Sequence, residues 1–220
     1  MITVYHLRRS RSERVAWLLE EMGVEYRLER IDRVDGRYAP ESLQAVHPLG
    51  RAPVIRDGET VLAESGAILQ YILARHGGGA LAVGADEPGF ADYLYWFHYA
   101  EASLMLQLLR ESSLVRIVPD VDRHSGMARV RQTTRQQLEY IEQSLAGRDY
   151  LAAGRFTAAD IMMLFPFTTL LEFLPGTLDL APYPRIKAYV ARLCARPGHA
   201  RAMARADAQQ EPINHPEETR

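Results

Sequence analysis

An acid and a hydroxyl lie side by side in the segment Ala63-Glu64-Ser65-Gly66, just before an apolar stretch with helical spacing. Ser65 is a natural N-cap residue, and the free N–H groups of a first helical turn can hold a carboxylate. Glu64 beside it has the charge to pair with an ammonium group. The two together would bind an amino-acid head group, which carries both charges. The alternative is a capped helix preceded by an unrelated acid.

A proline segment, Gly50-Arg51-Ala52-Pro53-Val54-Ile55, precedes an expected hairpin. Proline can open a strand because it has no N–H to donate to a neighbouring strand. If the Ala52–Pro53 bond is cis, the N–H and C=O of Ala52 face outward and can pair with an extended peptide, as an added strand does. The alternative is a trans proline that opens an edge strand, since cis is the minority form of X–Pro bonds.

Two serines lie in the turn Ser10-Arg11-Ser12-Glu13-Arg14, where a strand gives way to a helix. A hydroxyl at a helix N-terminus can donate a hydrogen bond to a bound anion such as a thiolate. Ser10 is the better candidate because it precedes the helix, whereas Ser12 is expected inside the first turn. The alternative is a capping box, in which Ser10 and Glu13 bond each other's backbone N–H groups.

A small mixed sheet is needed to position these segments. Alternating apolar residues predict strands, a 3.6-residue apolar period predicts helices, and Asp57-Gly58 is a typical hairpin turn. The resulting order is β-α-β, loop, β-β-α, which gives one parallel and one antiparallel pair of strands. The expected elements are strands at 1–6, 25–31, 53–56 and 60–62, with helices at 12–22 (ending at Gly23) and 65–76.

The remainder of the chain has no strand pattern and is expected to be helical. The helices are expected at about 89–116, 124–146, 157–173, 183–195 and 197–207. Thr157 and Asp160 form a capping-box pattern, and Pro166 should kink that helix or end its first segment. The predicted organisation is a sheet domain at 1–78, a linker at 79–88, an all-helical domain at 89–207 and a flexible tail at 208–220.

Composition narrows the range of partners. Of the 220 residues, 47% are apolar and 25% charged, and the formal net charge is −2. That balance gives no electrostatic basis for binding nucleic acid or an anionic membrane, and no apolar run is long enough to span a bilayer. The single cysteine, Cys194, excludes an internal disulfide, and His6, His47 and His98 lack metal-ligand spacing, so no metal site is expected. These features favour a cytoplasmic protein.

Several stretches, in order, resemble the cytosolic glutathione transferases, most closely the serine-type members of bacteria and fungi. They are HLRRSRSERVAWLLEEMGVEY, HPLGRAPVI, LAESGAILQYI, YWFHYAEASLM, FTAADIMMLFPF and YPRIKAYVARLCARPG. The resemblance covers the chain to about residue 207. It implies an α/β plus all-α fold: an N-terminal thioredoxin-like domain with a mixed four-stranded sheet and helices, and a C-terminal helical bundle domain.

The resemblance also implies roles for the three segments. Ser10 matches the catalytic serine, four residues before the arginine of the first helix. The residues that match the glutathione-binding positions are Arg51, Ala52, Pro53, Glu64 and Ser65. In the family the X–Pro bond is cis, the residue before it pairs with the cysteinyl backbone, and the Glu-Ser pair holds the γ-glutamyl end. Arg51 stands where the family often has a basic or amide residue near the glycyl carboxylate.

The implied chemistry requires little energy. A free thiol has a pKa near 8.5, and lowering it by about two units requires roughly 2.7 kcal/mol. A hydrogen bond to a charged acceptor contributes about 1.5–3 kcal/mol, and a helix N-terminus adds about 0.3–1. One serine hydroxyl is therefore sufficient, with no metal and no prosthetic group. Cys194, far from this segment, is expected to be an inert packed residue.

The expected reaction is conjugation of the co-substrate glutathione to a small hydrophobic electrophile, a detoxification. Tyr95, Tyr99 and Met105 are candidates for the second-substrate pocket, although the same spacing is typical of core residues. A homodimer is expected, with Glu101 reaching toward the partner's glutathione. Glutathione-dependent peroxide or disulfide reduction, and a non-catalytic binding module, remain as alternative functions.

Overall fold

The N-terminal part of the chain folds around a four-stranded mixed sheet, in the order β2-β1-β3-β4. The computed structural model describes residues 1–34, 38–173 and 178–207. β1 is parallel to β2 and antiparallel to β3, which is antiparallel to β4. The strands lie within a residue of their expected positions: β1 (Ile2–Leu7), β2 (Tyr26–Ile31), β3 (Val54–Asp57) and β4 (Thr60–Ala63). The expected thioredoxin-like arrangement is confirmed.

Two helices follow the strands as expected, α1 (Glu13–Met22) and α2 (Ser65–His76). Val15, Leu18 and Leu19 of α1 are fully buried, as their helical spacing predicts. Gly23 ends α1 in the left-handed conformation, with φ at 65°. A short 3₁₀ helix, η1 (Glu41–Ala45), lies in the long connection before β3.

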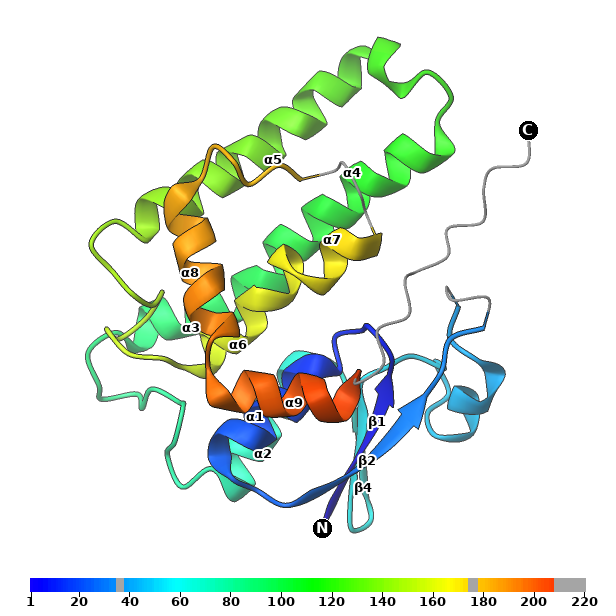
Figure 1. The fold of residues 1–220 in the computed structure, drawn as a ribbon, viewed down its shortest axis with the longest axis vertical. Coiled ribbons are helices and arrows are strands. Elements are labelled where there is room, and N and C mark those ends of the chain that lie inside the picture. Colours follow the sequence, from blue (N-terminus) through cyan, green and yellow to red (C-terminus); the bar gives the residue numbers. More distant parts are fainter. Residues whose placement is uncertain (35–37, 174–177, 208–220) are drawn as a thin grey trace. The chain divides into compact units, whose positions relative to one another are not determined.

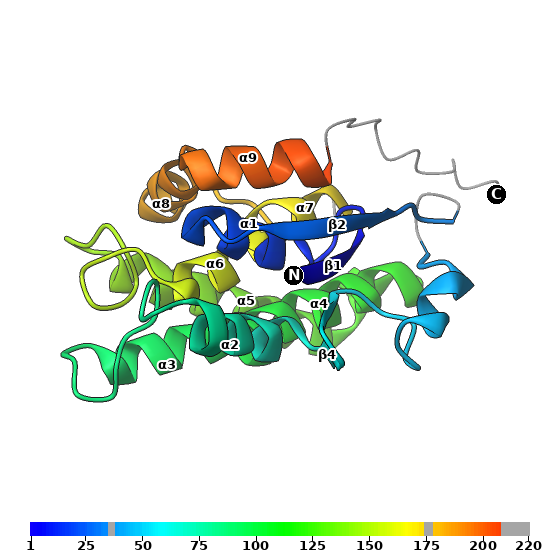
Figure 2. The ribbon, with the colours of Figure 1, turned by 90° about the horizontal axis from the view of Figure 1, so that it is seen from below.

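The chain forms two units, Met1–Gly78 with Arg196–Arg220, and Gly79–Ala195. The last described helix, α9 (Pro197–Ala206), therefore belongs with the sheet, although it was expected in the helical domain at 89–207. It packs against α1 (Figures 1 and 2). The expected tail at 208–220 lies outside the described residues.

Ion pairs and a close approach fix α9 on α1. Arg196 holds both carboxylate oxygens of Glu21, at 2.8 and 2.9 Å. A Cβ atom at Gly198 would lie 2.6 Å from Cδ of Glu21, so a larger residue there would push this carboxylate away. Trp17 of α1 is buried and meets the ring of His199 edge-on. In the sequence these charges have the pattern of a solvated helix face, which does not predict this packing.

The second unit is helical, as expected. The 89–116 helix is present but is interrupted by a π-helical segment in its middle, η2 (Ala100–Met105). Such segments occur mostly inside α-helices and are frequent at functional sites. The helical segments are α3 (Phe90–Tyr99), η2, α4 (Leu106–Ile117), η3 (Val121–Arg123), α5 (Ser125–Ser144), α6 (Ala158–Leu164), η4 (Phe165–Phe167), α7 (Thr169–Phe173) and α8 (Pro184–Cys194).

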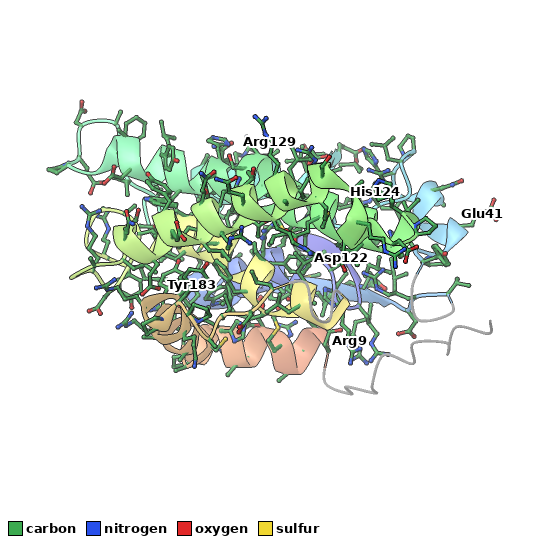
Figure 3. The ribbon with its side chains drawn as sticks, turned by 90° about the horizontal axis from the view of Figure 1, so that it is seen from above. Arg9, Glu41, Asp122, His124, Arg129 and Tyr183 are labelled. Carbon is green, nitrogen blue, oxygen red and sulfur yellow. The ribbon has the colours of Figure 1, made fainter. Side chains whose placement is uncertain are left out.

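α5 shows how the core of this unit is built. Its apolar residues at helical spacing, among them Val130, Leu138 and Ile141, are buried. Arg129 lies on its outer side and points away from the ribbon (Figure 3). None of the helices in the described residues is both long and apolar enough to cross a bilayer.

The capping box predicted at the start of α6 is formed. Thr157 is the N-cap, and the carboxylate of Asp160 accepts its backbone N–H at 2.8 Å. Asp160 is fully buried and also accepts hydrogen bonds from the Leu151 N–H at 3.1 Å and the Tyr189 hydroxyl at 2.8 Å. Burial raises the pKa of Asp160 to about 6, against the opposing effect of these donors. Pro166 ends α6 as expected, since a 3₁₀ turn follows Leu164.

Candidate active site

One row of the sheet brings the three candidate segments to the same edge. Tyr5 of β1 pairs with Val54 of β3, and Val54 pairs with Ala63 of β4. The chain after Tyr5, the chain before Val54 and the chain after Ala63 therefore leave the sheet on the same side. These are the serine turn at 8–12, the proline segment and the Glu-Ser pair. The topology thus gathers residues that lie more than fifty positions apart in the sequence.

At the end of β4 the backbone adopts a conformation that non-glycine residues seldom show. Glu64 has φ at 71° and ψ at 113°, and it is the N-cap of α2. Its side chain is exposed. Backbone held in such a region clusters at ligand-binding sites, because the surrounding structure must stabilise it. The carboxylate of Glu64 therefore stands at the edge of the sheet, on a strained turn.

Ser65 is the first residue of α2 and not its N-cap, so the capping role expected for it is wrong. Its side chain is buried and accepts a hydrogen bond from Nη1 of Arg14, at 3.2 Å. Arg14 is itself only 1% exposed, so this contact joins α1 to the start of α2 beneath Glu64. Arg14 and Ser65 lie 51 positions apart in the sequence, so no local pattern predicts this contact.

The Ala52–Pro53 bond is cis, as the family resemblance implied. Pro53 is buried and lies directly before β3, so it adjoins the row formed by Tyr5, Val54 and Ala63. Ala52 is partly exposed and Arg51 is exposed. Both therefore lie at the surface beside the Glu-Ser pair.

The two serines are hydrogen-bonded to each other. Their Oγ atoms are 2.6 Å apart, and Ser10 Oγ also accepts the backbone N–H of Ser12 at 3.2 Å. Ser12 is the N-cap of α1 and is fully buried, whereas Ser10 precedes it and is 8% exposed. Ser10 is thus placed before the helix as expected, and it is not the N-cap of a capping box with Glu13. Away from Ser10, Ser12 Oγ is hydrogen-bonded to Nδ1 of the buried His6, at 2.8 Å.

Comparisons with known proteins identify the family. The chain matches the family descriptions "Glutathione S-transferase, N-terminal domain" over residues 1–74 and "Glutathione S-transferase, C-terminal domain" over residues 117–197. Glutathione S-transferase 3 of Schizosaccharomyces pombe is 34% identical over 209 residues, which cover 90% of this chain and 84% of that protein. The chain belongs to the glutathione S-transferase family.

Solved structures of this family share the fold. A glutathione S-transferase from Actinobacillus pleuropneumoniae is 30% identical with a TM-score of 0.83, covering 97% of this chain and 99% of that one. A glutathione transferase from Phanerochaete chrysosporium, solved with oxidized glutathione, is 19% identical with a TM-score of 0.74, covering 95% and 97%. The predicted family and its two-part fold are thereby confirmed.

The three residues suggested for a second substrate differ in exposure. Tyr95 is 46% exposed, whereas Tyr99 is 9% and Met105 is 1% exposed. The rings of Tyr95 and Tyr99 stack at 5.4 Å, and Tyr95 meets Tyr140 of α5 edge-on at 6.2 Å. Burial and the hydrogen bond with Tyr140 raise the pKa of Tyr95 to about 12. Of the three, Tyr95 is therefore the one with an exposed ring, Tyr99 stacks against it, and Met105 is buried.

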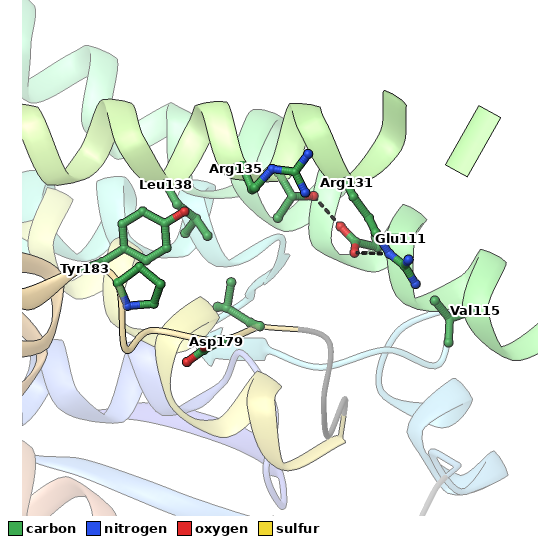
Figure 4. Close-up of a pocket in the computed structure, with 10 residues that line it drawn as sticks. Glu111, Val115, Arg131, Arg135, Leu138, Asp179 and Tyr183 are labelled. Atoms are coloured by element: carbon green, nitrogen blue, oxygen red, sulfur yellow. Dashed lines mark hydrogen bonds and ion pairs between the residues drawn. The ribbon is translucent and has the colours of Figure 1, made fainter. Parts of the chain in front are cut away.

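The helical unit of this transferase holds a cavity of about 410 Å³. Figure 4 shows the residues that line it. Glu111 and Val115 of α4 line one side of it, and four residues of α5 line another. The wall is completed by Leu178, Asp179, Pro182 and Tyr183. Glu111 is buried, accepts the hydroxyl of Thr134 and lies 3.7 Å from Nε of Arg131. Glu111, Thr134 and Arg131 of the cavity wall are thus paired with one another, and none of Tyr95, Tyr99 and Met105 lines the cavity.

The single cysteine of this transferase lies at the end of α8. Burial raises the pKa of the Cys194 thiol, so very little thiolate is present at neutral pH. This agrees with the inert role expected for it.

Proposed function

We propose that this glutathione S-transferase binds glutathione along the edge formed by the serine turn, the proline segment and the Glu-Ser pair, and ionises its thiol beside Ser10. The observation that carries the proposal is the row Tyr5–Val54–Ala63, which brings all three segments to one side of the sheet. A tripeptide with two carboxylates, an ammonium group and a thiol needs several such points of contact.

Each contact has a chemical counterpart in the ligand. Glu64 would pair with the γ-glutamyl ammonium, and the N–H groups at the start of α2 would receive the γ-glutamyl carboxylate beside Ser65. The backbone of Ala52 would pair with the cysteinyl residue, and Arg51 would face the glycyl carboxylate. Ser10 would then donate its hydrogen to the sulfur, because its Oγ lies before the helix, at the outer end of the hydrogen-bonded pair with Ser12.

The second substrate in this proposal is a small hydrophobic electrophile. The exposed ring of Tyr95, stacked on Tyr99, supports an apolar surface for it. The thiolate displaces a leaving group or adds to the electrophile, and the product is a thioether. The biological role would be detoxification in the cytoplasm.

Retention on a glutathione matrix and turnover with three substrate classes test the proposal. Conjugation of an aryl halide is expected, together with specific elution by glutathione. Dominant reduction of a hydroperoxide or a mixed disulfide would replace conjugation by one of the reductive activities. Retention without any turnover would indicate a binding module.

Replacing Glu64 by Gln is expected to weaken glutathione binding more than tenfold. The substitution keeps the side-chain length but leaves the γ-glutamyl ammonium without its charged partner, and a hydrogen bond to a charged group contributes about 1.5–3 kcal/mol. Isothermal titration calorimetry measures the change in Kd. Glu59→Gln is the matched control, since Glu59 lies in the turn between β3 and β4, at the opposite end of the hairpin. Equal affinities of Glu64→Gln and Glu59→Gln would remove Glu64 from the binding site.

We expect a homodimer, supported by apolar side chains that α4 leaves exposed on one face: Leu106, Leu109 and Ile117. Exposed apolar patches of this kind mark protein interfaces. Sedimentation equilibrium at micromolar concentration should give twice the chain mass of 24.9 kDa. Leu106→Glu should shift the species toward the monomer. A monomeric wild type would contradict both the dimer and the contact suggested for Glu101 with the partner's glutathione.

A further inference from the structure

A chain of four buried polar side chains leads from Ser10 into the interior of the first unit. Ser10 Oγ lies 2.6 Å from Ser12 Oγ, which lies 2.8 Å from Nδ1 of His6. On the other side of the ring, Nε2 of His6 lies 3.3 Å from Oδ2 of Asp207. His6 and Ser12 are fully buried, and Ser10 and Asp207 are each 8% exposed. The outer end of this chain is the group that faces the proposed thiol.

The direction of the hydrogen bonds along this chain depends on the protonation of His6, because each hydroxyl has a single hydrogen to donate. In the neutral ring with its hydrogen on Nε2, facing Asp207, Nδ1 accepts the hydrogen of Ser12. Ser12 Oγ then accepts the hydrogen of Ser10. A lone pair of Ser10 Oγ is left on the ligand side, so in this state Ser10 can accept a proton but cannot donate one to an anion.

In the imidazolium form of His6, both ring nitrogens are donors and the direction reverses. Nδ1–H donates to Ser12, the hydrogen of Ser12 turns toward Ser10, and the hydrogen of Ser10 is free to point at a ligand. The second lone pair of Ser10 Oγ accepts the Ser12 N–H in either state, at 3.2 Å. With the Nε2 hydrogen facing Asp207 and the contact between the two hydroxyls kept, protonation of His6 is therefore what frees the Ser10 hydrogen for a thiolate.

We propose that His6, held by Asp207, takes up the proton of the glutathione thiol through Ser10 and Ser12. This inference rests on the proposed binding of glutathione at Ser10. The S–H bond breaks and its proton passes to Ser10 Oγ, the hydrogen of Ser10 passes to Ser12 Oγ, and that of Ser12 passes to Nδ1. The electron pair stays on sulfur, and the positive charge appears on His6 beside the Asp207 carboxylate.

The same transfer leaves both serine hydrogens turned toward the ligand, so Ser10 stabilises the thiolate that it has helped to form. After sulfur has bonded to the electrophile, the proton returns through the two hydroxyls to the leaving group or to water. No oxidant or further reactant is needed. His6 never touches the substrate and is a positioning residue that acts through Ser12.

The surroundings of Asp207 suit this role. Burial alone would raise the pKa of Asp207, but His6, the N–H of Arg9 and the charge of Arg8 lower it below its usual value. Oδ1 of Asp207 lies 3.8 Å from Nε of Arg8, and Oδ2 of Asp207 lies 3.5 Å from the backbone nitrogen of Arg9. The guanidinium of Arg33 donates to the carbonyl oxygens of Arg8 and Arg9, at 2.8 Å each, and so fixes the turn. Asp207 therefore remains a carboxylate at neutral pH.

Other charged side chains lie on the elements that pack against β1, among them Glu13, Arg14 and Arg30. Glu13 and Arg14 are buried in the first turn of α1, and Arg14 donates to Ser65. Arg30 of β2 is the neighbour of His6 in the strand register, and its side chain is exposed. Among the described residues, Asp207 is the acidic partner within ion-pair distance of His6. Its carboxylate is therefore the group that compensates the charge of an imidazolium.

His6→Asn tests the proposal, because Asn keeps a polar atom toward Ser12 but cannot take up a proton. The thiolate absorbance of bound glutathione, titrated with pH in the full-length protein, should show the thiol pKa raised by at least one unit. Affinity for S-methylglutathione, which has no thiol proton, should stay within about threefold of the wild type. His124→Asn is the control, since His124 is exposed before α5 (Figure 3). An unchanged thiol pKa in His6→Asn would overturn the proposal.

Proton release gives an independent measurement on the unmodified enzyme. In weak buffer with a pH indicator, glutathione binding by the wild type should release almost no proton, because the proton stays on His6. Release of nearly one proton per thiolate formed would overturn the relay while leaving glutathione binding intact. Should His6→Asn fail to fold, Asp207→Asn and Ser12→Ala must raise the thiol pKa in its place. A wild type that binds no glutathione would instead refute the proposed function.

Discussion

Ser10→Ala is expected to raise the pKa of bound glutathione by one or more units and to slow conjugation at neutral pH about tenfold for each unit. The reason is the position of Ser10 Oγ, which lies before α1 at the outer end of the hydrogen-bonded pair with Ser12, so that the proposed proton transfer turns its hydrogen toward the ligand. Loss of this donor removes roughly 1.5–3 kcal/mol of preference for the anion. Titration of thiolate absorbance and kcat/KM with an aryl halide measure the two effects.

A merely structural role for Ser10 predicts a different outcome. The N-cap of α1 is Ser12, so the stability lost in Ser10→Ala should be below about 1 kcal/mol, with the thiol pKa unchanged if Ser10 has no contact with sulfur. Ser125→Ala, at an exposed position where α5 begins, is the control for a serine-to-alanine change. A pKa shift in Ser12→Ala without any in Ser10→Ala would contradict the assignment, since the relay requires both.

The sheet could be predicted from the sequence because its signals are local. The Asp57-Gly58 turn set the hairpin, and Gly23 set the end of α1. The helical spacing of Val15, Leu18 and Leu19 gave the buried face of α1. The order of these elements then fixed which strands are parallel, so the edge at which the three segments meet followed from topology.

Contacts between distant parts of the chain could not be predicted in the same way. His6 looked like an isolated structural histidine because its partner, Asp207, stands near the opposite end of the chain. The bond between Arg14 and Ser65 likewise joins two helices with a long connection between them. No spacing rule links such residues, and only the folded chain shows that they meet.

Backbone conformation was the other limit. Nothing in the residue type of Glu64 indicates a positive φ. The sequence therefore predicts Ser65 as the N-cap of α2, whereas the N-cap in the structure is Glu64. Tyr99 and Met105 have the same helical spacing as core residues of the expected 89–116 helix. The spacing therefore does not distinguish residues that line a pocket from residues buried in the core. The residue types of the π-helical segment between α3 and α4 likewise do not distinguish it from an α-helix.

Asp160→Ala should have the largest effect on stability, lowering the free energy of unfolding by about 3–5 kcal/mol. One buried carboxylate there joins three parts of the helical unit: the Leu151 N–H, the Thr157 N–H that caps α6, and the Tyr189 hydroxyl of α8. Alanine leaves all three donors buried without their acceptor, and each such group costs about 1–3 kcal/mol. Urea unfolding at about pH 8, above the pKa of Asp160 near 6, measures the loss with the carboxyl ionised.

Two further variants define the origin of this loss. Tyr189→Phe removes one of the donors and leaves the carboxylate in place, so it should cost about 1–2 kcal/mol, and it provides a measurement if Asp160→Ala does not fold. Asp86→Ala, at an exposed position before α3, should change stability by less than about 0.5 kcal/mol. A loss in Asp160→Ala no larger than that in Asp86→Ala would show that the buried carboxylate does not hold these three segments together.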